Sequence, residues 1–432
     1  GSLRRGGASA GTGPPAAGSA SDGMPGATLQ RILASLLPRV TEEHAFLADL
    51  LQINDDTLTF ADYMDLEPYF KHRAAVTMAL ATESPQQAMD RALQQIFSVI
   101  VPELDSFVSH VAQQNIWSVV GMLVETELAQ RALQQRPGGA AVSQLLNKNT
   151  TRLHTELSRL IHTQLQAVEQ TKVTAKKREG ILPIFQSFPT FVRRMEAQLG
   201  EADTLPVREA VDHGYERIAR GMMAAVQSIP QAGAIDDDKG QLNHHVILIV
   251  NVYHLCMRVR PGTPPNQALL RVQQQAQTLL ESSQHGYVKT MLRRPLGKVV
   301  DFGNGIDALL STTPATEVAL HSSYSRAAVK KLVRDFTMKD VRKCVEALSK
   351  RMQKHFDDDD ASMITSGALA RDELADVLAQ VWHATEDAFV AEVERLGRIL
   401  HTCYPQSGLH LDVSAQDVAR LFQTQAPTIR RR

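Results

Sequence analysis

The sequence predicts an all-α protein built from antiparallel helices joined by short loops. Apolar residues recur at spacings of three and four along most of the chain, which is the period of helices buried on one face. No long run alternates with the period of two that a strand requires. Aromatic residues make up only 5% of the 432 residues. Alanine, leucine and glutamine are abundant, and they favour helices because their side chains lose little freedom there.

Breaks that contain Pro or Gly divide this helical pattern, and both residues commonly end helices. Residues 1–27 are rich in Gly, Ala, Ser and Pro and have no apolar period, which predicts a disordered tail. The later breaks lie at 136–139, 180–183, 228–240, 260–265, 311–314, 356–367 and 403–408. From this pattern we predict helical bundles over 28–175, 176–310 and 311–432.

Two helices can be predicted from their first residues. Thr337 and Asp340 have the spacing of a capping box and predict a helix over 338–356, and Ser414 and Asp417 predict a short last helix. The apolar residues that should face the core in these two helices are Val341, Val345, Leu348, Met352 and Phe356, and then Val418, Leu421 and Phe422.

The most apolar stretch is HHVILIVNVYHLCMRV, residues 244–259. It is shorter than the roughly 20 residues that span a bilayer, and Asn251 and His254 interrupt it. We predict no transmembrane segment. The stretch is either a buried helix or a buried strand, since its β-branched residues fit both.

Residues 381–387, VWHATED, place His383 three residues before Glu386 and four before Asp387. These spacings bring side chains to one helix face, so a metal site is one interpretation. Two ligands are too few for zinc, which takes three or four. His401 would lie about 27 Å along the helix, because the rise is about 1.5 Å per residue.

We therefore expect no metal at VWHATED. A stripe of apolar residues at helical spacing runs along the same segment and includes Trp382 and Phe389. Both side chains are predicted to pack in the core, with His383 at the exposed edge of the stripe.

No catalytic or cofactor-binding motif is present, and we expect neither enzyme activity nor a cofactor. Asp301-Phe302-Gly303 matches a kinase triplet, but the other kinase motifs are missing. We expect Gly303 and Gly305 to mark a loop. The four aspartates at 357–360 lack the Gly and Glu of a calcium loop and predict a solvated linker. Cys256, Cys344 and Cys403 are far apart and odd in number, as expected for reduced thiols in a cytosolic protein.

Basic residues form three clusters although the formal net charge of the chain is only −1. Residues 326–354 contain ten basic and three acidic residues, a local net charge of +7. Two interpretations are open: solvated helix faces, or contacts with an acidic partner or with anionic lipid head groups. No aromatic residues interleave with the bases as stacking on nucleic acid requires, so we expect no nucleic-acid partner. The clustered residues are Lys176, Lys177 and Arg178, then Arg293, Arg294 and Lys298, and finally Lys330, Lys331 and Arg334.

Several stretches in order resemble one family. These are KREGILP at 177–183 followed by Phe185 and Phe188, YVKTMLRRPLGKVVDFGNG at 287–305, Tyr324 with VKKLV at 329–333, and VWHATEDAFVAEVERLGRILHTCYPQSG at 381–408. Residues 175–425 are similar to the C-terminal region of the Sec-three family of exocyst subunits (exocyst complex component one), and 85–175 resemble it more weakly. Pro405 and Gly408 belong to the Cys-Tyr-Pro-x-Ser-Gly end of the last stretch and, like Trp382, are given a structural role.

The resemblance implies an elongated helical rod of stacked antiparallel bundles, of the type found in tethering complexes. It implies a non-enzymatic subunit that helps hold secretory vesicles at the plasma membrane before fusion. The implied partners are the other exocyst subunits, with small GTPases and anionic plasma-membrane lipids as further candidates. The implied location is the cytoplasm, with peripheral attachment at sites of exocytosis. The family's lipid-binding domain and coiled coil lie N-terminal to this region, and neither pattern is visible in this chain.

Two other functions stay open. An all-α cytoskeletal or signalling adaptor would share the composition but not the ordered stretches of the family. A helical-bundle metalloenzyme would be built around His383 and Glu386, and it ranks below the adaptor.

Overall fold

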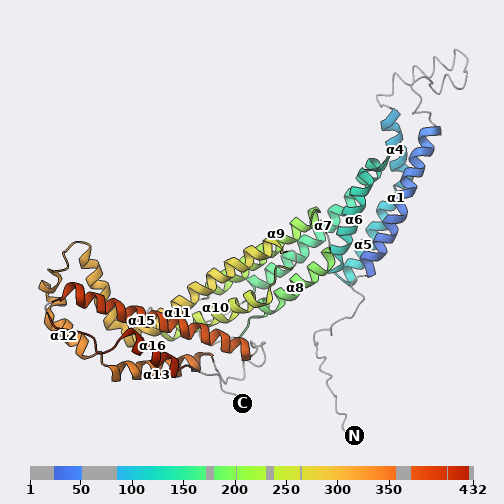
Figure 1. The fold of residues 1–432 in the computed structure, drawn as a ribbon. Coiled ribbons are helices and arrows are strands. Elements are labelled where there is room, and N and C mark those ends of the chain that lie inside the picture. The colour runs from blue at the N-terminus through green and yellow to red at the C-terminus, as the bar shows by residue number, and fades with distance from the viewer. Residues whose placement is uncertain are drawn as a thin grey trace, which may run out of the picture. The chain divides into compact units, whose positions relative to one another are not determined.

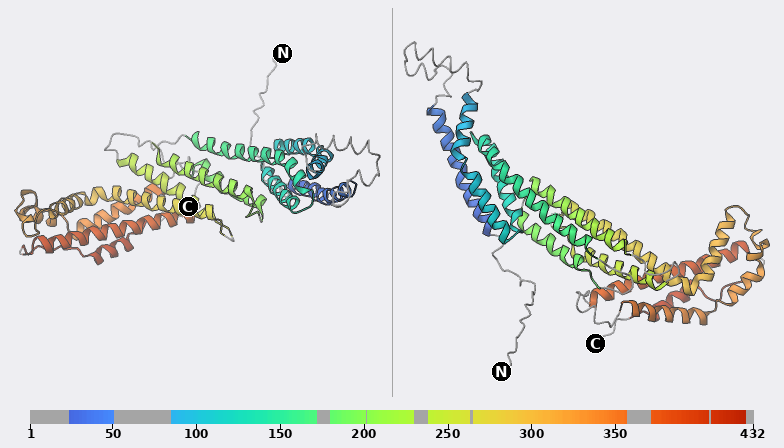
Figure 2. Two further views of the ribbon diagram at one scale, coloured as in Figure 1. Left: turned by 90° about the horizontal axis from the view of Figure 1, so that it is seen from above. Right: turned by 180° about the vertical axis from the view of Figure 1, so that it is seen from behind.

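The computed structural model describes residues 24–50, 85–171, 180–200, 202–229, 238–262, 265–356, 371–405 and 407–427. In these ranges the regular structure consists of thirteen α-helices and two short 3-10 helices, with no strand (Figures 1 and 2). The all-α prediction is therefore confirmed. The helices are α1 (Met24–Leu50), α4 (Pro85–Phe97), α5 (Ile100–Gln114), α6 (Ser118–Gln134), α7 (Gly139–Glu169), α8 (Pro183–Leu199), α9 (Pro206–Gln227), α10 (Asp238–Arg258), α11 (Gln267–Leu310), η1 (Val318–Leu320), η2 (Ser322–Tyr324), α12 (Arg326–Arg334), α13 (Met338–Phe356), α15 (Arg371–Cys403) and α16 (Ala415–Thr424).

The two helices predicted from their first residues are confirmed. The Thr337 hydroxyl donates to Asp340 Oδ2 at 2.6 Å before α13, and Ser414 and Asp417 form a capping box before α16. All eight apolar residues predicted to face the core in these helices are buried. The ambiguous stretch 244–259 is also resolved, because it lies in α10 up to Arg258.

The loop predicted at Gly303 and Gly305 is wrong, because both residues lie inside α11. Their small size serves packing instead, as described below. The structure also ends helices where no break was predicted, between α4 and α5, between α5 and α6, and between α8 and α9. Conversely, Pro38, Pro189 and Pro295 each lie inside a helix.

Several sequence predictions fall outside the described residues. They include residues 1–23 of the predicted tail, the basic cluster at 176–178 and the aspartates at 357–360. Residues 24–27 are described, and they form the first turn of α1.

Contacts divide the chain into two compact units. Unit 1 contains Gly1–Gln164 and Arg193–Gly214, and unit 2 contains Leu165–Val192 and Tyr215–Arg432. The division into bundles at 28–175, 176–310 and 311–432 stays a prediction. Likewise, the rod arrangement stays a prediction.

In unit 1, α6 is the central helix, because α1 and α5 both pack against it (Figure 1). A helix enclosed by neighbours must be apolar on most sides, and Val119, Val120 and Met122 are all fully buried. Helix α1 supplies a narrower stripe of buried side chains with spacings of four, three and four, namely Leu29, Leu33, Leu36 and Val40.

A buried carboxylate fixes the segment 193–214 within unit 1. Glu127 on α6 is only 5% exposed. Its Oε2 accepts the backbone N–H of Val207 at 3.0 Å, and its Oε1 lies 2.9 Å from His154 Nε2 on α7. Because a buried carboxylate is costly without partners, these contacts specify where α9 begins.

Helix α11 contacts several elements of unit 2. It packs against α10, α15 and η1. It also contacts α13, since the Tyr287 hydroxyl lies 2.8 Å from His355 Nδ1. Tyr287 is fully buried, so this polar contact lies at the core of the unit.

Three glycines of α11 make room for side chains from neighbouring elements. A Cβ atom at Gly286 would overlap the His245 ring of α10, and one at Gly305 would overlap the Tyr324 hydroxyl of η2. A Cβ atom at Gly303 would lie 3.0 Å from Arg395 Cζ of α15. These glycines are therefore packing notches on a continuous helix.

Asn251 explains why the apolar stretch of α10 contains an amide. Its side chain is fully buried. Its Oδ1 accepts the N–H of Leu182 at 2.7 Å, and its Nδ2 donates to the carbonyl of Gly180 at 3.3 Å. The residues that precede α8 are thus held against α10 by side-chain hydrogen bonds.

Helix α10 also carries three largely buried histidines, His244, His245 and His254. No hydrogen-bond partner reaches the Nδ1 atom of any of them within the described structure. Burial lowers the pKa of all three imidazoles, and for His245 it lowers the pKa from 6.5 to about 4, with a smaller contribution from His244. The folded protein therefore holds these rings neutral.

Among the described helices, none is both long and apolar enough to cross a bilayer.

Changing Gly305 to Ala tests the packing notch. The new Cβ atom must displace Tyr324, and we expect the free energy of unfolding to fall by about 1–2 kcal/mol despite the better helix propensity of Ala. Gly297→Ala is the matched control, because nothing lies within 4 Å of the added Cβ atom in the same helix. It should stabilise the protein by up to about 1 kcal/mol. Urea unfolding of both variants measures this, and equal effects would contradict the notch.

The buried histidines predict a loss of stability in mild acid. As the pH falls below 6.5, unfolded histidines bind protons that the folded protein excludes. Stability is therefore full above pH 6.5 and should decline as the pH falls towards about 4. Replacing His245 with Phe keeps an aromatic ring without a titrating group and should make the decline shallower. Melting temperatures measured across this window check the prediction, and parallel curves for both proteins would refute it.

Candidate functional site

Helix α15 places the VWHATED residues on two different faces. Trp382 is buried, its indole N–H donates to the carbonyl of Phe422 at 3.1 Å, and its ring lies 4.6 Å from that of Phe422. Phe389 is fully buried and packs against the same ring. Trp382 and Phe389 therefore join α15 to α16.

His383 lies on the solvent side of the same helix. Its side chain is 73% exposed, with Nδ1 3.5 Å from Glu386 Oε2 and Nε2 3.9 Å from Asp387 Oδ2. Across the described ranges, no three His, Cys, Asp or Glu side chains gather as a metal site requires. The geometry here is that of weak contacts between an exposed imidazole and two carboxylates.

Pro405 and Gly408 follow the end of α15. Gly408 has a φ of +65°, the left-handed conformation that glycine adopts without strain. The chain turns back here beside Tyr404, which is buried. The Tyr404 hydroxyl donates to the carbonyl of Tyr324 at 2.5 Å. Burial raises the pKa of Tyr404 to about 12, so its hydroxyl stays protonated and able to donate.

The three thiols are free and poorly reactive. Cys256 and Cys344 are half-buried and Cys403 is buried. Burial raises the pKa of each thiol, to about 11 for Cys256. The prediction of three unpaired cysteines is confirmed, and at neutral pH they are not activated nucleophiles.

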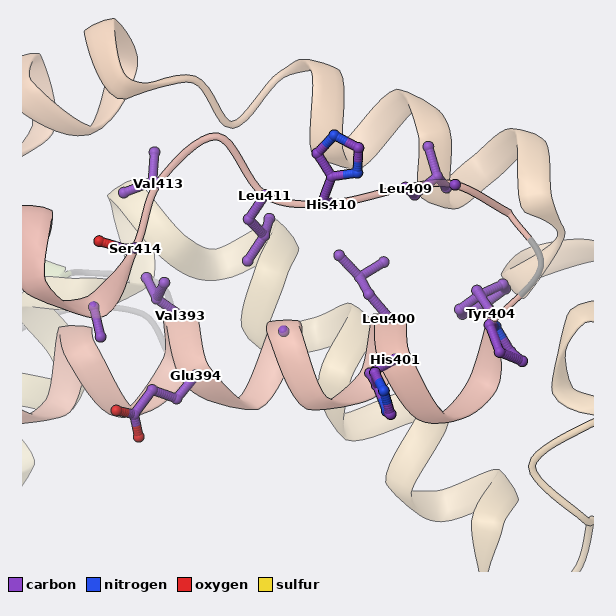
Figure 3. Close-up of a pocket in the computed structure, with 14 residues that line it drawn as sticks. Val393, Glu394, Leu400, His401, Tyr404, Leu409, His410, Leu411, Val413 and Ser414 are labelled. Atoms are coloured by element: carbon purple, nitrogen blue, oxygen red, sulfur yellow. The ribbon is translucent and has the colours of Figure 1, made fainter.

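A groove of about 510 Å³ lies between α15 and the returning segment 409–415. Figure 3 shows Val393 and Leu400 on the side of α15 that faces this segment, and Leu411 pointing back towards the helix. Figure 3 shows His401 and Glu394 on the other side of α15, although both contribute to the lining of the groove. The groove is therefore lined mainly by apolar side chains, without the converging polar groups that an active site needs.

The structure places two of the predicted basic clusters on exposed surfaces of unit 2. Arg293, Arg294 and Lys298 are exposed on α11. Lys330, Lys331 and Arg334 are exposed on α12, opposite the fully buried Val329. The third cluster, 176–178, lies outside the described residues.

Helices α12 and α13 together carry nearly all of the positive charge of 326–354 on their exposed sides. We call this set the α12–α13 basic surface. Lys330 and Lys331 form no ion pair with any described residue, and Arg334 Nε is 3.9 Å from Asp335. The exposed members are Arg326, Lys330, Lys331, Arg334, Lys339, Arg342, Lys343, Lys350 and Lys354.

Sequence reasoning missed one residue beside this surface. Leu320, the last residue of η1, is 82% exposed. Leu320 ends a three-residue Val-Ala-Leu run that is too short to show helical or strand periodicity, so no pattern indicated its exposure. The structure reveals its exposure, because Val318, two residues earlier, takes the buried position.

Comparisons with known proteins point to one family. The model of the family described as "Exocyst complex component Sec3, C-terminal" matches residues 50–406. Proteins named "Exocyst complex component 1" are similar to the chain: 20% identity over 395 residues for the mouse protein, covering 90% of this chain and 41% of the relative. The Drosophila melanogaster protein is 20% identical over 412 residues, covering 92% of this chain and 43% of the relative. The Dictyostelium discoideum protein is 22% identical over 349 residues, covering 79% of this chain and 36% of the relative.

The chain thus spans less than half the length of these relatives. No solved structure matches it.

Neighbouring substitutions in α15 test the assignment of its faces. Trp382→Ala should lower the free energy of unfolding by about 3–5 kcal/mol, because it removes a buried ring and its hydrogen bond. His383→Ala should change it by less than about 0.5 kcal/mol, because the side chain is exposed. Thermal and urea unfolding measure both. A large effect of His383→Ala, or bound metal found by elemental analysis, would favour the metalloenzyme hypothesis.

Proposed function

The chain belongs to the family of exocyst complex component Sec3 C-terminal regions, and from this premise we propose that it is a non-enzymatic subunit of the exocyst. In this role it helps hold secretory vesicles at the plasma membrane before fusion. One observation carries the proposal: the family model matches residues 50–406, which include most of the described helices of both units.

The proposed mechanism is binding. A tethering subunit needs stable helices whose exposed faces contact other subunits, and the buried stripes of α1, α13 and α15 leave the opposite faces of these helices to solvent. We propose that the helices stack into a rod that sets the spacing between vesicle and membrane. The partners are the other exocyst subunits, with small GTPases and anionic lipids as further binding partners of exposed basic residues. The location is the cytoplasmic side of the plasma membrane at sites of exocytosis.

A cytoskeletal or signalling adaptor is the second candidate function. The all-α fold suits it equally well, since fold alone does not determine function. The family match favours the exocyst. The metalloenzyme hypothesis has less support, because the carboxylates that lie near His383 are two residues of its own helix, Glu386 and Asp387.

Co-purification from cytosol tests the proposal. With the folded chain as bait, we expect several exocyst subunits to be recovered in comparable amounts and identified by mass spectrometry. The Gly305→Ala variant, unfolded beforehand by heat, serves as a control for non-specific capture. Recovery of cytoskeletal or signalling proteins without exocyst subunits would replace the proposal with the adaptor function.

A further inference from the structure

Leu320 is the most exposed large apolar side chain among the described residues. It is 82% exposed, and the next is Val99 at 62%. Burying a leucine stabilises a protein or complex by roughly 1.5–3 kcal/mol. Within the described structure the Leu320 side chain gains almost none of this stabilisation, because it stays exposed. Contact with a molecule outside the chain would supply it.

The turn that carries Leu320 is firmly packed. Val318, two residues earlier, is fully buried in a cluster with Ile306 and Leu400. The N–H of Leu320 donates to the carbonyl of Glu317 at 2.9 Å, and the N–H of His321 donates to Val318 at 3.2 Å. Leu320 is therefore presented to solvent by an ordered 3-10 turn.

The same cluster anchors the helix that carries the bases. Val329 of α12 is fully buried in it, beside Val318. Contacts also join η1 to η2 and η2 to α12. The exposed leucine and the exposed bases of α12 thus belong to one packed end of unit 2, and Figure 1 shows α12 at that end.

The segment that carries Leu320 and α12 is net positive. Between Leu310 and Thr337 the acids are Glu317 and Asp335, against four bases on α12. Helix α13 adds five further exposed bases, which complete the α12–α13 basic surface. An anionic surface is the complementary partner.

We propose that this end of unit 2 docks on an anionic lipid bilayer, with the α12–α13 basic surface contacting lipid phosphates and Leu320 entering the interfacial layer. The inference deepens the proposed function, on which it rests, because it commits the basic residues to lipid. Basic residues attract anionic leaflets, and an inserted apolar side chain adds a second signal that charge alone does not supply.

Two features favour a bilayer over an acidic protein segment. The exposed bases are spread over two consecutive helices, from residue 326 to 354, and are not gathered at one point. In addition, Leu320 is a single exposed apolar side chain on a 3-10 turn. A protein partner is usually met by a contiguous apolar patch or pocket. A bilayer interface accepts one isolated apolar side chain without a complementary pocket.

Vesicle co-sedimentation tests the proposal with the folded chain. The chain should bind vesicles that contain phosphatidylserine, bind phosphatidylcholine vesicles much more weakly, and lose affinity as salt rises. Combined Lys330→Glu, Lys331→Glu and Arg334→Glu should weaken binding by at least about tenfold. Leu320→Ser should weaken it by roughly tenfold.

Matched controls separate these effects from general changes in charge or hydrophobicity. Combined Arg39→Glu, Arg136→Glu and Lys148→Glu make the same change in net charge at exposed positions of unit 1. Val99→Ser removes another exposed apolar side chain there. Neither control should reduce vesicle binding. Unchanged melting curves should show that all four variants fold.

Insertion has its own readout. A fluorophore sensitive to polarity, attached to Leu320→Cys, should shift to shorter wavelength on phosphatidylserine vesicles, because the label enters the interface. The proposal is overturned if the label does not shift, if binding does not depend on phosphatidylserine, or if the α12 and Leu320 variants bind vesicles as the controls do.

Co-purification of these variants with exocyst subunits tests the proposed function separately from vesicle binding. Variants that lose vesicle binding but still co-purify with exocyst subunits support both proposals. If charge reversal on α12 instead removes an exocyst subunit and the chain binds no vesicles, the basic surface is a protein contact and the lipid proposal fails. Failure of co-purification by the unmodified chain would count against the exocyst role alone.

Discussion

The packing of side chains into the glycine notches of α11 is the constraint on which unit 2 depends. His245 of α10, Arg395 of α15 and Tyr324 of η2 each reach a position where α11 has no Cβ atom. Three neighbouring elements therefore meet one continuous helix at close range. Glycine weakens a helix by about 1 kcal/mol relative to Ala, and the contacts made over the notches offset that loss.

The notch at Gly305 has a consequence beyond packing. Tyr324 rests on it, and the carbonyl of Tyr324 accepts the buried hydroxyl of Tyr404. This joins the end of α15 to the chain between α11 and α12. Tyr324 packs against the core on one side of the turn and Val318 is buried on the other, so packing on both sides constrains the turn that exposes Leu320. The exposure of Leu320 thus follows from the packing of Val318 and Tyr324 in the core.

Periodicity was sufficient to predict the fold class and the core faces of α13 and α16, because the buried residues of each helix lie along one face at helical spacing. It failed where a residue serves a partner distant in sequence. Gly303 and Gly305 were predicted to mark a loop, since glycine often ends helices, but their partners Arg395 and Tyr324 lie far along the chain. Asn251 similarly interrupts an apolar run because it bonds residues that precede α8. The basic clusters of the candidate site could be read from composition, whereas Leu320 could not.

The distribution of charge determines which part of the chain an anionic surface would attract. The whole chain has a formal net charge of −1, and residues 326–354 alone carry +7, so the remaining residues together carry −8. Since salt screens charges beyond about 10 Å, an anionic bilayer would attract the α12–α13 basic surface locally and act little on the acidic residues elsewhere. Attraction confined to one surface orients a molecule as well as binding it. Docking through α12 would leave the other helix faces available to partner subunits, so membrane contact and complex assembly need not compete for the same residues.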